Sequence, residues 1–344
     1  MPPESPQKRK NKLTLSAFLN KEATPRRGLC WFEWVMIIYA LATFVFIAVF
    51  FGRLNHPGTM IMGRILAMLM TAALWGAYRL WPCRLIMTLR VAAQILLLSW
   101  WYPDTYELNV VFPNLDHIFA SWEQALFGCQ PALLFSQNFP SPWVSELLSL
   151  GYVSYYPMIA AVAFYYCIRH YDRFLYCSYV ILGAFFLFYV IFIFLPVVGP
   201  QYYYMAVGTD QIAQGFFPDL GYYFHDHQAS LTIPGYKDGF VYHLLQQAHD
   251  AGERPTAAFP SSHVGISVVL LWLAYEARSR KLFYVLLPLS VLMFFATFYI
   301  QAHYAIDAIA GIFVGTAIYF LLRHLYKPHK PHESHRPYRP HETH

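Results

Sequence analysis

Two short polar stretches interrupt the apolar second half of the chain, and each contains a histidine. The first reads FPSSH over residues 259–263, and the second reads HYAID over residues 303–307. His303 and Asp307 stand four residues apart, a spacing that places two side chains on one face of a helix. The carboxylate can then accept a hydrogen bond from one imidazole nitrogen and leave the other nitrogen as a nucleophile. The pair therefore predicts an activated histidine.

The serines of the first stretch extend this chemistry toward phosphate. Ser261 and Ser262 come directly before His263, at the point where an apolar helix is predicted to begin. The first backbone N–H groups of a helix have no partner within it, and such a terminus is suited to binding phosphate. Two serines, a histidine at a helix start and an aspartate-oriented histidine together indicate phosphoryl chemistry.

The composition indicates which elements position these residues. Of 344 residues, 57% are hydrophobic and only 12% are charged, whereas a soluble domain carries about 25% charged residues. The apolar blocks reach the length of about 20 residues that crosses a bilayer. We therefore predict an all-α integral membrane protein with about eight transmembrane helices. The expected spans are residues 31–51, 61–81, 85–102, 143–167, 174–196, 263–277, 282–300 and 303–323.

Charge sets the expected orientation. Eight spans place both termini on one side, together with most of the 24 Lys and Arg residues, and such a positive side faces the cytoplasm. His263 and His303 then lie on the exoplasmic face. The expected segments are a cytoplasmic basic tail (1–28), a transmembrane catalytic domain (29–326) with exoplasmic loops at 103–142 and 197–260, and a His/Pro-rich disordered tail (327–344).

At these two motifs the chain resembles the type 2 phosphatidic acid phosphatase superfamily. The resemblance rests on FPSSH and on HYAID followed by AIAG, and it covers a motif-bearing core of residues 143–323. It implies a six-helix phosphatase-like bundle in which His303 attacks phosphorus and forms a phosphohistidine. It further implies that Asp307 orients His303, that His263 protonates the leaving alkoxide and that the two serines help to hold the phosphate. The expected substrates are membrane lipids, with no nucleic acid, metal or other cofactor.

Two departures from the family pattern refine the expectation. Gln201, in LPVVGPQYYY at 195–204, stands where the family carries a phosphate-binding cation, and Thr297 stands where it usually carries arginine. The inositol phosphorylceramide synthase branch also has threonine at this second position. The resemblance to that branch favours transfer of a phosphorylated, inositol phosphate-like head group between lipids such as phosphatidylinositol and ceramide.

Several alternatives remain open at the level of sequence. The further candidate residues for holding phosphate are Arg254, Gln201, Tyr202 and Lys237, although Arg254 equally suits a loop position beside lipid head groups and a solvated loop position is favoured for Lys237. One alternative function is a lipid phosphate phosphatase acting on undecaprenyl pyrophosphate, phosphatidate or a lipid A phosphate. A second alternative is a non-catalytic lipid-binding relative. A bacterial inner membrane with a periplasmic site and a Golgi membrane with a lumenal site predict the same charge pattern, and the oligomeric state stays open.

Other polar residues have simpler interpretations. His225, His227, His243 and His249 match no zinc-ligand spacing, and a solvated loop is expected for them. Arg64 and Arg90 fall inside predicted spans, where ionisable groups are functional suspects. We expect Arg64 to extend toward the membrane surface, because it lies only a few residues from the end of its span.

Overall fold

A computed structural model of the chain describes residues 15–26, 28–252 and 254–327. The chain is 75% helix, and no strand occurs in the described residues, so the all-α prediction is confirmed. The His/Pro-rich tail after residue 327 and the first fourteen residues lie outside the described part. Within the predicted basic tail, α1 (Leu15–Leu19) forms, and Lys21 pairs with Cys83 at the turn before α4.

The apolar segments predicted as spans all form helices, but they differ in length. Six are long and apolar enough to cross a membrane: α2 (Trp31–Val49), α3 (Pro57–Leu80), α4 (Arg84–Asn109), α9 (Tyr171–Phe194), α14 (Arg280–Tyr299) and α15 (Ala305–Leu325). A seventh span is available if α7 (Pro142–Val153) and α8 (Tyr155–Arg169), bent by 44°, count as one. The remaining helix, α13 (Ser262–Glu276), has 15 residues. At about 1.5 Å per residue it is shorter than the hydrocarbon core of about 30 Å.

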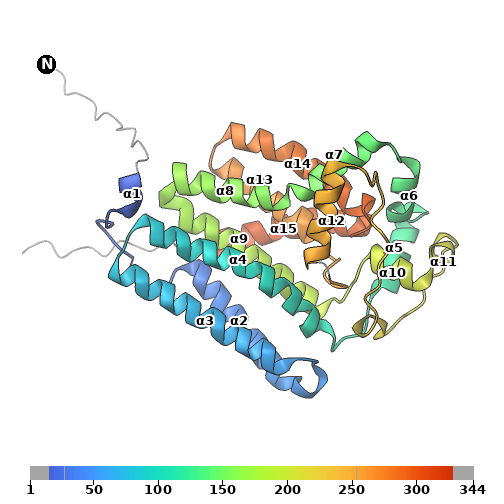
Figure 1. The fold of residues 1–344 in the computed structure, drawn as a ribbon, viewed down its shortest axis with the longest axis horizontal. Coiled ribbons are helices and arrows are strands. Elements are labelled where there is room, and N and C mark those ends of the chain that lie inside the picture. Colours follow the sequence, from blue (N-terminus) through green and yellow to red (C-terminus); the bar gives the residue numbers. More distant parts are fainter. Residues whose placement is uncertain (1–14, 27, 253, 328–344) are drawn as a thin grey trace, which may run out of the picture.

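The two connections predicted as exoplasmic loops contain several short helices. In the first connection, residues 103–109 continue α4, and α5 (Asp116–Phe127) and α6 (Pro131–Asn138) follow. The second connection contains α10 (Pro200–Val207), α11 (Thr209–Ala213), the 3-10 turn η2 (Tyr223–His225) and α12 (Phe240–Gly252). A second 3-10 turn, η1 (Phe51–Arg53), follows α2. Figure 1 shows α5, α6, α10 and α11 at one end of the elongated bundle and α1 at the other. We call these the site end and the basic end.

The centre of the bundle is formed by α9 and α13. The most apolar window of α9 is 78% buried, and α13 packs against α8, α9, α14 and α15. Small residues allow the close approach of α13 and α15. A Cβ atom added to Gly311 would lie 2.6 Å from the carbonyl oxygen of Ser261, and one added to Gly315 would overlap the backbone of Gly265. The glycines of α15 therefore pack against the start of α13, which brings the two histidine motifs together.

Two buried ion pairs connect the N-terminal helices to the bundle. Arg64 on α3 pairs with Asp104 on α4 at 2.7 Å, and Arg90 on α4 pairs with Glu33 on α2 at 2.6 Å. The expectation that Arg64 extends to the membrane surface is wrong, because its side chain is only 2% exposed. A carboxylate on the neighbouring helix provides the charge partner that Arg64 would otherwise have to find at the surface.

Candidate active site

His303 is held by the backbone of the other histidine motif. Its Nδ1 atom lies 2.7 Å from the carbonyl oxygen of Ala258, one residue before the FPSSH stretch. A carbonyl only accepts, so Nδ1 carries the proton and the lone pair of the neutral ring lies on Nε2. The amide of Ala258 in turn donates to the carbonyl of Val197 at 2.9 Å, which fixes this support in place.

The carboxylate of Asp307 lies closer to the backbone beside His303 than to the imidazole ring of His303. Helix α15 begins at Ala305, so His303 lies before the helix and not on its first turn, as the i, i+4 argument assumes. The Oδ2 atom of Asp307 accepts from the amide of Tyr304 at 2.8 Å. The same atom lies 3.7 Å from Nδ1 of His303, beyond hydrogen-bond distance. The aspartate therefore caps its own helix and lies near the His303 ring at more than hydrogen-bond distance.

His263 faces His303 directly. It lies in the first turn of α13, and its Nδ1 atom is 3.4 Å from Nε2 of His303. Because the lone pair of neutral His303 lies on Nε2, the proton in this contact belongs to His263. A phosphorus atom attacked by Nε2 must take the place of this contact. The geometry thus pairs a ring with a basic nitrogen and a ring that can donate a proton.

Two tyrosines enclose the ring of His263. The ring centroids of Tyr152 and Tyr155 each lie 4.5 Å from that of His263, the first stacked and the second tilted. Tyr152 belongs to α7 and Tyr155 to α8, and the bend between these helices is at Ser154. The hydroxyl of Ser154 donates to the carbonyl of Gly151 at 2.6 Å, a local bond of the kind that bends helices. The bend therefore brings one tyrosine from α7 and one from α8 into contact with the same imidazole.

The two serines of FPSSH occupy different positions. Ser261 is the N-cap of α13, where its hydroxyl accepts from the amide of Val264 at 3.4 Å and its own amide donates to the carbonyl of Asp307 at 3.0 Å. Ser262 lines a small cavity together with His263 and His303. The two serines predicted to hold phosphate therefore differ in position: Ser261 caps the helix, and Ser262 lines the cavity.

The cavity between the motifs has a volume of about 20 Å³, which is enough for about one water molecule. Gln201 and Tyr202, both predicted to bind substrate, line it, and so do Tyr102 and Tyr152. The side chain of Gln201 donates to the carbonyl of Leu231 at 2.8 Å and lies 3.0 Å from His249. A phosphoryl group needs more room than this, so binding must move the side chains that line the cavity.

No lysine or arginine stands among the described residues that line this cavity. Lys237 lies exposed in the turn before α12, and Arg254 is exposed beside Tyr106 and Glu107 of α4. Neither cation is brought to the histidines. Thr297, which stands at the family's arginine position, is fully buried and donates to the carbonyl of Phe294. The site is therefore poor in positive charge apart from its histidines.

Asp116 ties three segments of the site together. Its carboxylate accepts from the amides of Val198 and Gly199 at 2.7 and 2.9 Å, from the Asn114 side chain at 2.6 Å and from the Tyr304 hydroxyl at 3.0 Å. Burial raises the pKa of Asp116, and these donors lower it in turn. Because the donors fill the lone-pair positions of both oxygens, we assign the ionised form. Tyr304 follows His303 directly, so Asp116 helps to position His303.

Gly199 shows how close this packing is. Its φ angle is +88°, a conformation that favours glycine. An added Cβ atom would lie 2.6 Å from the carbonyl oxygen of Ala302, the residue before His303. The loop that follows α9 can approach Ala302, and with it His303, this closely only because residue 199 has no side chain.

Glu123 supports the same helix from the other side. It is fully buried on α5, and its Oε2 atom accepts from the amide of Ile306 in the first turn of α15 at 3.1 Å. Burial raises the pKa of Glu123 to about 8, with the charge of Asp307 as a further cause. The carboxyl is therefore neutral at physiological pH and serves as a hydrogen-bonding support.

Sequence reasoning missed Asp116, Glu123 and the two tyrosines around His263. The acids had a readable signal, because residues 116 and 123 are seven apart and share one face of α5 with the buried Phe119 and Ala120. An acid on the apolar face of a helix needs a partner. The tyrosines had no comparable signal, since their contact with His263 depends on the bend between α7 and α8.

Comparison with known proteins agrees with this geometry. A family model described as the PAP2 superfamily matches residues 117–321, which is more than half of the chain. The chain belongs to this superfamily, whose members are typically phosphatases or phosphotransferases of lipids. The protein is thus an integral membrane protein of the phosphatase-type lipid enzymes. No curated protein and no solved structure matches it. The family match begins in α5, which includes Glu123 in the family region.

Proposed function

We propose that the protein transfers a phosphorylated head group from one membrane lipid to the hydroxyl of another. The donor we favour is a glycerophospholipid such as phosphatidylinositol, and the acceptor is a ceramide-like lipid. The observation that carries this choice is the absence of lysine and arginine from the described lining of the cavity. A phosphodiester has one negative charge, whereas a phosphomonoester carries about −1.5 to −2 at neutral pH. A pocket whose only titratable cations are histidines suits the phosphodiester.

The reaction proceeds in two balanced steps. Nε2 of His303 attacks phosphorus and forms a P–N bond, while the P–O bond to the donor's glycerol breaks and His263 gives its proton to the departing oxygen. His263 then takes a proton from the acceptor hydroxyl, the acceptor oxygen attacks phosphorus, and the P–N bond breaks. The imidazolium of His263 is restored, and His303 is released. No metal or other cofactor is needed for either step.

The surrounding residues take supporting roles in this proposal. Asp307 balances the positive charge that the His303 ring gains when it is phosphorylated, from 3.7 Å away. Ser262, Gln201 and Tyr202 line the cavity and are placed to donate to phosphoryl oxygens. Ser261 caps the start of α13, and its amide donates a hydrogen bond to the carbonyl of Asp307. Arg254 and Lys237 lie outside the cavity, where they can meet only a head group that extends beyond it.

The orientation forms part of the proposal. The basic end carries the N-terminus of α2 and the described basic turns, so we assign it to the cytoplasm. The histidines at the site end then face the exoplasmic side, which is the periplasm for a bacterial inner membrane or the lumen for a Golgi membrane.

Reconstitution in phosphatidylcholine liposomes tests the reaction. Wild type and His303→Ala are supplied with labelled phosphatidylinositol with and without ceramide, and in parallel with phosphatidate. We expect a phosphorylated ceramide product that requires both lipids and is lost in His303→Ala. Rapid release of inorganic phosphate from phosphatidate without any acceptor would identify a phosphatase instead. If no phosphohistidine can be trapped with any of these lipids, the protein is a non-catalytic lipid-binding relative.

A further inference from the structure

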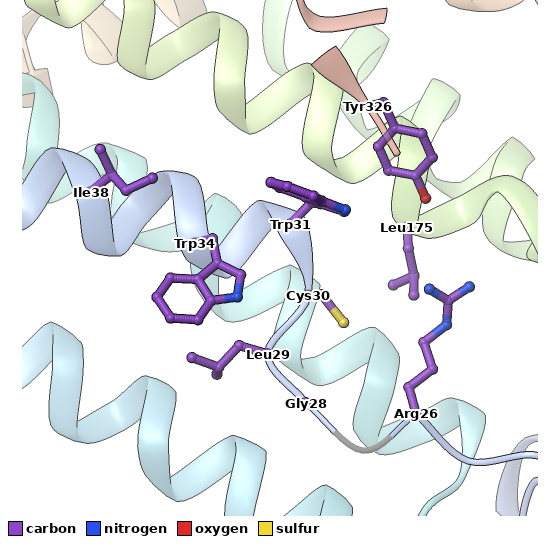
Figure 2. Close-up of a pocket in the computed structure, with 9 residues that line it drawn as sticks. All are labelled: Arg26, Gly28, Leu29, Cys30, Trp31, Trp34, Ile38, Leu175 and Tyr326. Carbon is purple, nitrogen blue, oxygen red and sulfur yellow. The ribbon is translucent and has the colours of Figure 1, made fainter. Parts of the chain in front are cut away.

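A groove of about 330 Å³ lies at the basic end, far from the histidines. It opens beside the first two turns of α2, between that helix, α9 and the residue after α15. Figure 2 shows its lining, with Ile38 at one end and the Arg26 guanidinium and Tyr326 hydroxyl together at the other. We propose that this groove binds an anionic glycerophospholipid, with its phosphate at Arg26 and Tyr326 and an acyl chain along α2.

The apolar part of the groove has the form that an acyl chain requires. Trp31, Trp34 and Ile38 follow one another at i, i+3 and i+7, so they form one stripe along α2. Their side chains are 40, 46 and 61% exposed in a helix that is long and apolar enough to cross the membrane. Leu175 on α9, which is 7% exposed, contributes to the opposite wall. Tryptophans at such a level are typical of the boundary between head groups and acyl chains.

At the polar end of the groove, Arg26 forms no ion pair within the described residues. Its guanidinium lies beside the Tyr326 hydroxyl. The nearest acids in the sequence have other partners. Glu22 accepts from the hydroxyls of Tyr78 and Tyr171, and Glu33 pairs with Arg90. A guanidinium and a phenol hydroxyl are both donors that suit a phosphate group.

The wider charge pattern favours an anion at this end over a zwitterion. Helix termini and turns at the basic end carry further cations. Besides Arg26, the described cations at this end include Lys21, Arg79, Arg84, Arg169, Arg173, Arg278, Arg280, Lys281, Arg323 and Lys327. Clusters of this kind beside a membrane span attract anionic lipids. The combination of a cation and an apolar channel identifies a lipid and not a free anion, because the stripe on α2 offers nothing to inorganic phosphate.

Photo-crosslinking tests the proposal on the full-length protein. The protein is placed in nanodiscs of phosphatidylcholine that contain a phosphatidylglycerol probe with a photoreactive acyl chain, and the crosslinked peptides are identified by mass spectrometry. We expect crosslinks within residues 29–38 and around Leu175. Arg26→Gln should weaken them about fivefold, the effect of one cation near an anionic surface. Arg280→Gln, an exposed cation at the same end but away from the groove, should leave them unchanged.

Other outcomes overturn the proposal in different ways. Equal crosslinking of a phosphatidylcholine probe would show that the groove takes any lipid, and competition by inorganic phosphate would show that it takes a free anion. A crosslinked pair of protein chains without lipid would show that a second copy covers the groove. Ile38→Trp fills the apolar end without removing a charge, and unchanged crosslinking in this variant would place the acyl chain elsewhere. Because none of these readouts uses turnover, they are independent of the proposed reaction.

Discussion

The Nδ1 atom of His303 donates to the carbonyl oxygen of Ala258 over 2.7 Å, whereas the nearest oxygen of Asp307 is 3.7 Å away. The backbone of the first motif therefore sets the tautomer of the histidine in the second motif. A histidine–aspartate pair four residues apart suggests a simpler device, in which the carboxylate does this directly. The difference has a measurable consequence, because a carbonyl support survives substitution of the aspartate.

Asp307→Asn should reduce turnover by about tenfold to a hundredfold, a modest loss on the scale of acid–base catalysis. The asparagine oxygen can still accept from the Tyr304 amide, and Ala258 still holds Nδ1 of His303, so the tautomer persists and only the charge is lost. His303→Ala removes the nucleophile and should leave no detectable transfer. Initial rates with saturating lipid in liposomes measure both.

The matched control for this pair is the melting temperature of each variant in detergent, which should stay close to that of wild type. If Asp307→Asn is as inactive as His303→Ala while remaining folded, the carboxylate and not the carbonyl sets the ring. Phosphohistidine that forms in Asp307→Asn but decays slowly would support the role of Asp307 in balancing charge.

Substitution of Tyr152, which stacks on His263, gives a second prediction. Tyr152→Phe retains the stacked ring and should keep most of the activity, whereas Tyr152→Leu removes the stack but fills apolar space. An aromatic pair contributes about 0.5 to 1.5 kcal/mol beyond its buried area, so Tyr152→Leu should lower kcat by about threefold to tenfold with little change in KM. Steady-state rates against lipid fraction separate the two parameters. Phe164→Leu, an exposed aromatic residue on α8, is the control, and a loss in Tyr152→Phe equal to that in Tyr152→Leu would contradict a role for the ring.

The sequence sufficed for the helices, for the membrane class and for the meeting of the two motifs. Apolar block length predicted each apolar helix of the bundle, including the bent pair of α7 and α8 and the short α13, because it depends on local composition. The cation-poor lining could also be anticipated, since Gln201 and Thr297 replace charged residues directly in the sequence.

The contacts that hold the site could not be read in this way. The support of His303 comes from a backbone carbonyl at position 258, and every residue type offers the same carbonyl. The position of Arg254 could not be predicted either. It lies beside Tyr106 and not beside the histidines because of how residues 197–260 fold. Periodicity carries no information about such pairings between distant segments.

Asp116 should be among the least tolerant positions of the protein. Asp116→Asn replaces an acceptor oxygen with an NH₂ group that faces donors, and we expect a loss of about 2 to 4 kcal/mol in unfolding free energy. Tyr304→Phe removes only one of the same hydrogen bonds and should cost about 1 kcal/mol. Thermal unfolding in detergent orders the two variants. A stability of Asp116→Asn equal to that of Tyr304→Phe would mean that the amides of Val198 and Gly199 find other acceptors.

Glu123 predicts a dependence of stability on pH. The folded-state pKa of about 8 exceeds the ordinary glutamate pKa of 4.5, so the folded protein binds more protons than the unfolded chain between these values. Stability from this group is therefore complete below about pH 4.5 and declines as pH rises through about 8. Glu123→Gln mimics the neutral carboxyl and should flatten this decline. Melting temperatures measured between about pH 6 and pH 9 test it, with the exposed Asp238→Asn as control. A decline of the same steepness in Glu123→Gln would assign it to another group.

The orientation of the site can be tested with single cysteines. Lys237 is exposed at the site end and Arg280 at the basic end, so cysteines at these positions report opposite faces of the membrane. The native Cys129 is partly exposed near α6 and is replaced by serine, while Cys30, Cys83, Cys167 and Cys177 are buried and remain. Because the basic end should face the cytoplasm, a membrane-impermeant maleimide added to sealed bacterial spheroplasts that carry the protein in their inner membrane should label Lys237→Cys at once and Arg280→Cys only after permeabilisation. In the wild-type protein, which retains Cys129, this cysteine should be labelled in the same way as Lys237→Cys. The reverse order would place the histidines on the cytoplasmic face, and the lipids available to the enzyme would then be those of the inner leaflet.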